Sequence, residues 1–409
     1  MSKPIYLDYA ATTPVDREVL QAMLPYFSDN FGNAMSIHSV GQEAMQGVDH
    51  SRQQMANFFA CTPSEVIFTS GATESNNLAV KGVLKAYYTQ AKKDLPKPHL
   101  ITSLFEHHCV LDSVRAVEKE GLAEVTYIRP DKNGLVRVAD IKKAIHSNTI
   151  FISIMYVNNE IGTVQPIAKI GKLVKKINAT REEQAFPIIF HTDATQAINY
   201  FDCDVEKLGV QLLSMSAHKI YGPKGVGALY IQKGTPIRKI QDGGDQEYKM
   251  RAGTHNVTGI VGLGKAIALV QKNRAKDNKK IQALRDYLIA KVLTEIPQTR
   301  LNGSKTHRSP NNANFSFASV EGEGLLLSLD MEKISCSTGS ACSSGALSAS
   351  HVLLSIGLRP EEAHGSLRMT IGKFTTKAEL NIMVKKLKGI LTRLRKISGS
   401  VLDEYYAKK

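Results

Sequence analysis

Residues 188–196 read Ile-Ile-Phe-His-Thr-Asp-Ala-Thr-Gln, and residues 212–219 read Leu-Leu-Ser-Met-Ser-Ala-His-Lys. Both begin as short apolar runs, the candidate strands Ile188–Thr192 and Leu212–Ser216. Neither has the strict alternation of a half-exposed strand, which is typical of strands covered on both faces. A residue able to do chemistry follows each run, Asp193 in the first and Lys219 in the second. Because ligands of parallel sheets bind at the carboxyl ends of the strands, we expect these two side chains to lie together there.

Similar runs alternate with amphipathic stretches through the middle of the chain. The other candidate strands are Glu65–Ser70, His99–Ser103, Glu124–Ile128, Ile150–Tyr156 and Val226–Ile231. The candidate helices between them include Asn76–Tyr88, His108–Lys119 and Ile167–Ile177. This βαβα order predicts an α/β fold with a large, mainly parallel sheet that has helices on both sides.

The pattern changes near Gly262. The segments that follow are a long helix at Leu263–Val292, strands at Asn314–Phe317 and Lys333–Cys336, and a closing helix at Ile382–Ile397. We therefore expect a large domain at residues 15–262 and a smaller α/β domain formed by residues 1–14 and 263–409. The stretch at about 335–350 is rich in Ser, Gly and Ala and predicts a long loop within the smaller domain.

Composition narrows the class of protein. Five scattered cysteines do not suggest a disulfide framework and fit a reducing cytoplasm. We expect no leader peptide, and the longest apolar stretch, at 150–157, is too short to span a membrane. Lys and Arg outnumber Asp and Glu by 52 to 38, but they are dispersed at helical spacing. This pattern favours solvated helix faces, compatible with an acidic protein partner, over direct nucleic-acid binding.

Lys219 is unusual because lysines normally lie on solvated faces rather than at strand ends. An amine held partly away from water is a nucleophile suited to forming a Schiff base. By itself, Asp193 could bind a metal, cap a helix or pair with a protonated ring nitrogen. Pyridoxal phosphate (PLP) needs both a lysine and a carboxylate for its pyridinium nitrogen, so the pair Asp193 and Lys219 favours this cofactor.

A phosphate site is expected where Thr69-Ser-Gly-Ala-Thr-Glu-Ser75 joins a strand to a helix. Gly71 permits a tight turn, and the backbone N–H groups of Ala72 and Thr73 would point at an anion along the helix dipole. Many strand-to-helix turns look alike, so this motif gains its meaning from Asp193 and Lys219.

The cluster Phe105-Glu-His-His-Cys109 also follows a strand and invites a zinc interpretation. Adjacent residues of an extended segment face opposite ways, however, and no second Cys/His pair has ligand spacing. We therefore expect no metal, and instead a single histidine of this cluster that stacks on, or donates protons to, an aromatic cofactor.

The loop 335–345 reads Ser-Cys-Ser-Thr-Gly-Ser-Ala-Cys-Ser-Ser-Gly. A thiol among small residues on a loop is accessible, which thiolate chemistry requires, so this loop offers a candidate nucleophile. A small apolar side chain in a loop is the plain alternative. A disulfide between Cys336 and Cys342 is a third one, which the expected compartment disfavours.

Together these segments resemble the cysteine desulfurases of the NifS/IscS-like group, whose active-site cysteine lies in a Gly-Ser-Ala-Cys loop. The order and spacing of the motifs make the resemblance specific, and it runs nearly from end to end. The matching segments are 6–14, 31–33, 69–76, 106–107, 157–162, 191–196, 216–227, 251–254, 339–342 and 363–368.

The resemblance implies the type I PLP-dependent transferase fold, similar to aspartate aminotransferase, and a homodimer with two shared sites. It implies Lys219 as the Schiff-base lysine, Asp193 as the pyridinium partner and His107 as the ring-stacking acid or base. It further implies that Gln196 donates a hydrogen bond to the phenolic oxygen of the cofactor. The phosphate would be bound by Ala72, Thr73, Ser216 and His218, with Thr254 from the other subunit. Asn159 would contact cofactor and substrate, and Arg368 would bind the substrate carboxylate.

The reaction implied by the resemblance converts L-cysteine to L-alanine and leaves a persulfide on Cys342. The implied partners are sulfur-acceptor proteins of iron–sulfur cluster assembly or of a tRNA-thiolation relay. The chain stops at Lys409, whereas members that dock a scaffold through the C-terminus have a longer tail. The alternatives are another type I PLP enzyme, such as a selenocysteine lyase or an aminotransferase, and a non-catalytic sulfur-assembly subunit that only binds partners.

Overall fold

The computed structural model describes residues 4–90, 96–182, 185–338 and 349–407. In this part of the chain seven strands form the larger sheet, in the order β2-β8-β7-β6-β5-β3-β4. Their bounds are β2 Val66–Thr69, β8 Gly227–Ile231, β7 Leu212–Ser216, β6 Ile189–Asp193, β5 Thr149–Ser153, β3 His99–Ser103 and β4 Glu124–Ile128. From β4 to β7 all pairs are parallel, whereas β8 runs antiparallel to β7 and to β2. The expected, mainly parallel sheet is confirmed.

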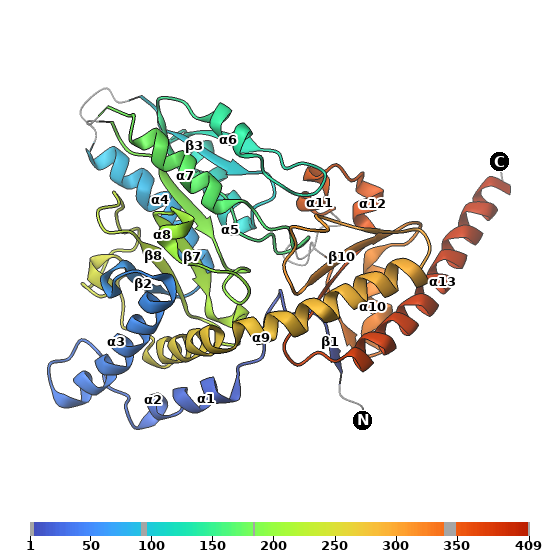
Figure 1. The fold of residues 1–409 in the computed structure, drawn as a ribbon, viewed down its shortest axis with the longest axis horizontal. Helices are drawn as coiled ribbons and strands as arrows, with labels where there is room; N and C mark the ends of the chain where they lie inside the picture. Colours follow the sequence, from blue (N-terminus) through green and yellow to red (C-terminus); the bar gives the residue numbers. More distant parts are fainter. Residues whose placement is uncertain (1–3, 91–95, 183–184, 339–348, 408–409) are drawn as a thin grey trace.

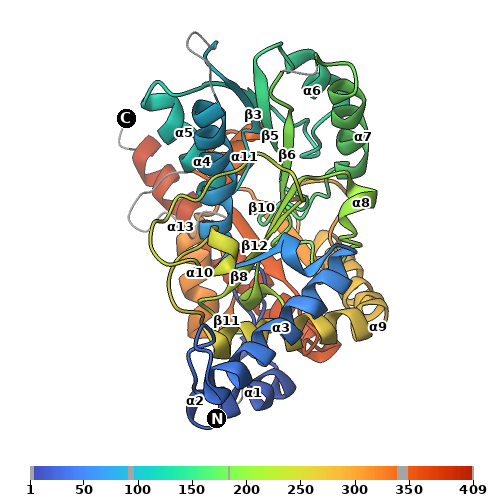
Figure 2. The same ribbon diagram turned by 90° about the vertical axis from the view of Figure 1, so that its left-hand side faces the viewer.

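Helices cover both faces of this sheet (Figure 2). Helices α4 (Ala72–Gln90) and α5 (His108–Lys119) pack on one face against β3, β5, β6 and β7. Helices α3 (Ser39–Phe59), α7 (Ile167–Asn178) and the first part of α9 (Val257–Glu295) pack on the other. Consecutive residues such as Phe151 and Ile152 point to opposite faces of the sheet, and each is buried in the core on its own side. Because both faces are buried, the strands do not alternate between apolar and polar residues.

A second, antiparallel sheet has β10 (Asn312–Phe317) between β9 (Thr299–Leu301) and β12 (Ser366–Thr370). Helix α9 extends from the larger sheet to this one, where α10 (Gly322–Met331) and α13 (Lys377–Ala407) also lie (Figure 1). Strands β1 (Ile5–Tyr6) and β11 (Ile334–Ser335) form a short parallel pair. The remaining helices are α1 Arg17–Met23, α2 Pro25–Ser28, α6 Val138–Ala144, α8 Val205–Leu208, α11 His351–Ser355 and α12 Pro360–His364, with 3₁₀ turns at Pro63–Glu65 (η1), Ala217–Lys219 (η2) and Glu247–Lys249 (η3).

The second sheet has a hydrophobic core of its own. Leu7 near the N-terminus packs with Phe315, Leu367 and Leu387 in this core. The N-terminal segment is therefore part of the same hydrophobic core as the C-terminal part of the chain. Helix α11, in contrast, buries Val352 and Leu353 in the core of the larger sheet. The domain boundaries at residues 14/15 and 262/263 stay a prediction.

Helix ends differ most from the expected bounds. Helix α4 begins at Ala72 rather than near Asn76, because Gly71 completes the turn with a φ of 154° that other residues rarely adopt. Glu74 stabilises the start of α4 by accepting a hydrogen bond from the Ser70 N–H at 2.8 Å. Within the described part of the chain, no helix has the length and apolarity required to cross a bilayer.

A buried ion pair fixes the turn η3 next to the larger sheet. The Arg52 guanidinium donates to both oxygens of Glu247, at 2.8 and 2.6 Å, and the Phe68 N–H donates to the same carboxylate at 2.7 Å. Glu247, Tyr248 and Lys249 all have φ between 48° and 67°, a conformation that costs free energy for residues other than glycine. Burial alone would raise the pKa of Glu247, but hydrogen bonds from Arg52 and His255 lower it to about 2.

We predict that Glu247→Gln lowers the free energy of unfolding at neutral pH by about 3–5 kcal/mol, because removing one partner leaves the Arg52 charge buried and unpaired. Asp140→Asn is the matched control, since its pair with Arg137 is exposed and contributes less than about 1 kcal/mol. Denaturant unfolding of the three proteins measures both differences.

The effect of Glu247→Gln should depend on pH. Since the folded pKa of about 2 lies below the unfolded value of about 4.3, the carboxylate contributes fully above about pH 4.3. Its contribution falls as the pH drops toward about 2, so the stability gap between wild type and variant should narrow there. A gap that stays constant below about pH 4.3 would contradict the role of this carboxylate.

Candidate active site

A cavity of about 620 Å³ lies at the carboxyl edge of the larger sheet. It is lined by ten of the twelve residues that the sequence singled out: Ala72, Thr73, His107, Asn159, Asp193, Gln196, Ser216, His218, Lys219 and Arg368. Thr254 is exposed and does not line the cavity of its own chain, and Cys342 lies outside the described residues. The fold therefore brings to one place ten of the residues that the motifs and the resemblance singled out.

Asp193 is the last residue of β6, and its carboxylate is almost fully buried. Asn76 Nδ2, on α4, donates to Asp193 Oδ2 at 2.8 Å, and the Thr195 N–H donates to Oδ1 at 2.9 Å. The second bond closes a short turn rather than capping a helix. Both contacts hold the carboxylate in one orientation at the floor of the cavity.

Lys219 lies in η2, immediately after β7, and β7 pairs with β6, the strand that ends at Asp193. Its Nζ donates to the carbonyl oxygens of Ala10 and Ala11 at 2.7 and 2.6 Å, and Gln196 Nε2 donates to the Ala10 oxygen at 2.9 Å. The N-terminal segment is thus a wall of the cavity. Segment 6–14 carries part of the resemblance, but the contact of Ala10 and Ala11 with Lys219 was not predicted, because a carbonyl oxygen carries no side-chain signature.

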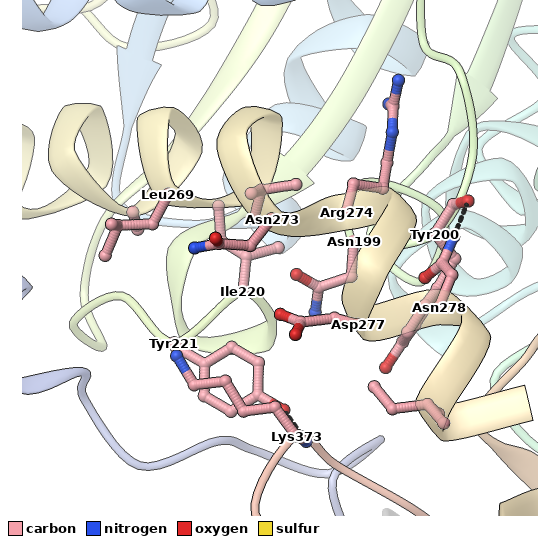
Figure 3. Close-up of a pocket in the computed structure, with 13 residues that line it drawn as sticks. Asn199, Tyr200, Ile220, Tyr221, Leu269, Asn273, Arg274, Asp277, Asn278 and Lys373 are labelled. Atoms are coloured by element: carbon pink, nitrogen blue, oxygen red, sulfur yellow. Dashed lines mark hydrogen bonds between the residues drawn. The ribbon is translucent and has the colours of Figure 1, made fainter.

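A second, much smaller cavity of about 30 Å³ lies beside helix α9 and next to Ile220 and Tyr221, which follow η2 in the chain (Figure 3). It has room for a water or two. In its wall, Asn199 Nδ2 donates to the Lys219 carbonyl oxygen at 2.8 Å, and Asn278 Nδ2 of α9 donates to the Tyr200 carbonyl oxygen at 2.7 Å. These bonds tether the backbone of the lysine turn and the adjoining segment.

The start of α4 lines the cavity and is suited to binding an anion. The N–H groups of Ala72 and Thr73 lie in the first helical turn, where they have no intrahelical acceptor and carry the positive end of the helix dipole. Strand β8 approaches closely here, since a Cβ on Gly227 would lie 2.7 Å from the Gly71 Cα. Burial, with the charges of Lys219 and Lys224, lowers the pKa of His218 to about 4, so its ring is neutral at pH 7.

His107 caps the N-terminus of α5, and its Nδ1 accepts the Cys109 N–H at 3.2 Å. Burial lowers the pKa of His107, so the ring is neutral at pH 7 and its proton is on Nε2. The Cys109 thiol lies 3.0 Å from the same Nδ1 and also accepts from Asn76, and burial raises its pKa. Sequence reasoning did not assign Cys109 to the cavity. No three His, Cys, Asp or Glu side chains in the described ranges come together as metal ligands.

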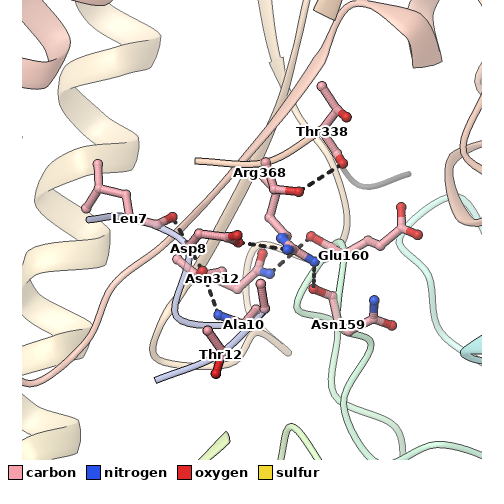
Figure 4. Close-up of polar contacts among 12 residues, drawn as sticks. Leu7, Asp8, Ala10, Thr12, Asn159, Glu160, Asn312, Thr338 and Arg368 are labelled. Atoms are coloured by element: carbon pink, nitrogen blue, oxygen red, sulfur yellow. Dashed lines mark hydrogen bonds and ion pairs between the residues drawn. The ribbon is translucent and has the colours of Figure 1, made fainter. Parts of the chain in front are cut away.

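Arg368 lies on β12 of the second sheet and reaches the cavity from the opposite side (Figure 4). Its Nη2 pairs with Asp8 Oδ1 at 2.8 Å, and its Nη1 donates to the Asn159 carbonyl oxygen at 3.1 Å. Arg368 is both an ion-pair partner and a cavity residue. Its Nε and the Asn159 Oδ1 are buried without a partner among the described residues, so polar capacity is left for a ligand.

Comparison with known proteins agrees with this geometry. Residues 5–383 match the family model of class-V aminotransferases. The cysteine desulfurase IscS of Dictyoglomus turgidum is 49% identical over 398 residues, which cover 97% of each chain. A solved NifS-like protein has a TM-score of 0.86 at 33% identity, covering 95% of this chain and 99% of that one. The solved structure of SspA in complex with cysteine has a TM-score of 0.78 at 34% identity, covering 91% and 100%.

The match to the family model covers most of the chain, and the relatives are matched over nearly their full length. The type I transferase fold and the resemblance to the NifS/IscS-like group are thereby confirmed. The chain belongs to the class-V aminotransferase family and, within it, to the cysteine desulfurases of the IscS group.

Proposed function

We propose that this chain removes sulfur from L-cysteine with the help of PLP, giving L-alanine and a persulfide on Cys342. The observation that carries the proposal is the convergence of Asp193, Lys219, His107 and Arg368 on one cavity. The names of the relatives support the reaction, and the cysteine complex of the related SspA supports the substrate.

The cavity fits PLP in size and in chemistry. Its volume of about 620 Å³ lies within the usual range of cofactor sites, about 300–1,000 Å³. Asp193 would pair with the ring nitrogen, and Gln196 would donate to the phenolic oxygen. Ala72, Thr73, Ser216 and His218 would hold the phosphate, with Thr254 supplied by the partner in a homodimer.

When bound, PLP supplies an electron sink that stabilises negative charge at the substrate Cα. Lys219 Nζ is the group we assign to attach the cofactor and then to move the Cα proton. His107 would stack on the ring and, through its Nε2 proton, act as an acid toward the substrate. Its fixed Nδ1 contact keeps that proton directed away from α5.

The substrate carboxylate would bind at the second-sheet side of the cavity. Arg368 presents a guanidinium whose Nε has no partner among the described residues, and its Nη1 contacts the backbone of Asn159. The Asn159 side chain would donate to the carboxylate through its Nδ2. The Asp8 contact holds the guanidinium plane while leaving donors for a carboxylate.

Sulfur transfer would take place at Cys342. Its thiolate attacks the substrate sulfur, so an S–S bond forms while the Cβ–S bond breaks. The electron pair of the broken bond stays with the substrate carbon skeleton, which takes up a proton and leaves as L-alanine. We propose sulfur-acceptor proteins of iron–sulfur assembly or tRNA thiolation as the recipients, and the cytoplasm as the compartment.

Lys219→Ala should abolish the visible absorbance of lysine-bound PLP, because no other amine is assigned to attach the cofactor. Lys224→Ala is the matched control, since Lys224 lines the same cavity without that role, and it should keep the band. An absorbance scan of the purified proteins decides the matter. An unchanged spectrum of Lys219→Ala would refute the assignment.

Cys342→Ser should retain that absorbance but lower the release of sulfide and alanine from cysteine by roughly a thousandfold or more, as expected when a nucleophile is removed. Cys61→Ser, which changes a thiol that does not line the cavity, should stay active. In the wild type, mass spectrometry after incubation with cysteine should show one added sulfur on the Cys342 peptide. Sulfide release by Cys342→Ser at the wild-type rate, or no release by the wild type, would overturn the proposal.

A further inference from the structure

Ser350 follows Cys342 by eight residues and contacts a buried carboxyl group. Its hydroxyl donates to Glu160 Oε2 at 2.5 Å, and both residues are only 4% exposed. The same hydroxyl accepts the Leu353 N–H at 3.2 Å and so caps helix α11. Glu160 therefore holds the first turn of α11, directly after the segment that carries Cys342.

Glu160 is also bound to the part of the structure that we assign to the substrate carboxylate (Figure 4). Its carbonyl oxygen accepts from Asn312 Nδ2 at 3.0 Å and from Asn314 Nδ2 at 3.1 Å, both on β10. Strand β10 pairs with β12 so that Asn314 lies opposite Arg368. The residue before Glu160 is Asn159, whose carbonyl oxygen accepts from Arg368.

Burial of the Glu160 carboxyl group costs free energy, because its charged form is removed from water. Burial raises its pKa to about 7, against the opposing effects of the Ser350 hydroxyl and the Arg368 charge. No step of the proposed reaction uses this group. Among the described residues, this buried carboxyl has one side-chain hydrogen bond, from Ser350, and we therefore look for its role in positioning.

Two further contacts involve described residues on either side of Cys342 in the chain, Ser337 and His351. On the N-terminal side, Ser337 exchanges two backbone hydrogen bonds with Arg368, at 3.2 and 2.6 Å. On the C-terminal side, His351 Nε2 donates to the Glu106 carbonyl oxygen at 3.0 Å, and Glu106 precedes His107. Ser337 and His351 are therefore bound to residues that are, or adjoin, the groups assigned to substrate and proton transfer.

We propose that Glu160 is a positioning residue, which through Ser350 sets the reach of Cys342 toward a cysteine held by Arg368 and Asn159. The inference rests on the proposed function and adds to it the coupling between the carboxylate site and the sulfur-accepting thiol. A series of described contacts then leads from β12 through β10 and Glu160 to α11, the helix that follows Cys342 in the chain.

The test measures the rate of persulfide formation on Cys342 at saturating cysteine in a single turnover. Ser350→Ala and Glu160→Ala should each slow it roughly tenfold, the effect of losing one hydrogen bond to a charged group. Glu160→Gln and Ser350→Thr keep a hydrogen-bonding pair and should recover most of the rate. The double variant should be no slower than the slower single variant, because both changes remove one contact.

Ser355→Ala is the matched control, because this buried hydroxyl lies on the same helix and donates to the Val352 carbonyl oxygen instead. It should react at the wild-type rate, and all variants should keep the absorbance of lysine-bound PLP. Persulfide formation by Ser350→Ala at the wild-type rate, or effects that multiply in the double variant, would overturn the proposal. If Glu160→Ala does not fold, Ser350→Ala decides alone.

Hydrogen–deuterium exchange separates this inference from the proposed function. The amides of α11 should lose protection in Ser350→Ala but not in Ser355→Ala, whatever reaction the enzyme performs. If the wild type forms no persulfide but α11 shows this exchange pattern, the proposed function is refuted, while the contact between Glu160 and Ser350 is still shown to hold α11. Unchanged exchange in Ser350→Ala would show that Ser350 does not hold α11 and would refute this inference, even if the wild type forms the persulfide.

Discussion

Parallel pairing of β6 with β7 brings Asp193 level with Ser214, so that Lys219 follows at the same edge of the sheet. Strands β3 and β5 run in the same direction and deliver His107 and Met155 to that edge. Strand β8 runs the other way, so its first residue, Gly227, lies there against Gly71. Strand direction therefore decides which residues can share the cavity, and the other features of the site are built on this edge.

The second sheet completes the cavity from the opposite side. Its strand β12 contributes Arg368, and the N-terminal segment contributes the carbonyl oxygens that contact Lys219. The end of the cavity that we assign to the cofactor thus belongs to the larger sheet, and the end that we assign to the substrate carboxylate belongs to the smaller one. Glu160 links the two, because its backbone is bound to β10 while its side chain holds α11, which packs in the core of the larger sheet.

Local sequence was sufficient for features that are themselves local. Strands such as His99–Ser103 and Leu212–Ser216 were predicted residue for residue, since buried apolar runs mark them clearly. Asp193 and Lys219 were found because each comes directly after such a run. Arg368 and Asn159 came only from the resemblance, because they meet across 209 residues of chain. The contact between Glu160 and Ser350 left no signal either, since it depends on how two distant loops pack.

The central claim is that Lys219 carries the cofactor beside Asp193 at this edge of the sheet. Reduction of the purified enzyme with borohydride, followed by peptide mass mapping, tests it most directly by fixing the cofactor to the residue that holds it. The account predicts a pyridoxyl label on the peptide that contains Lys219, and none on Lys224. A label on another lysine, or no label in protein that contains PLP, would contradict it.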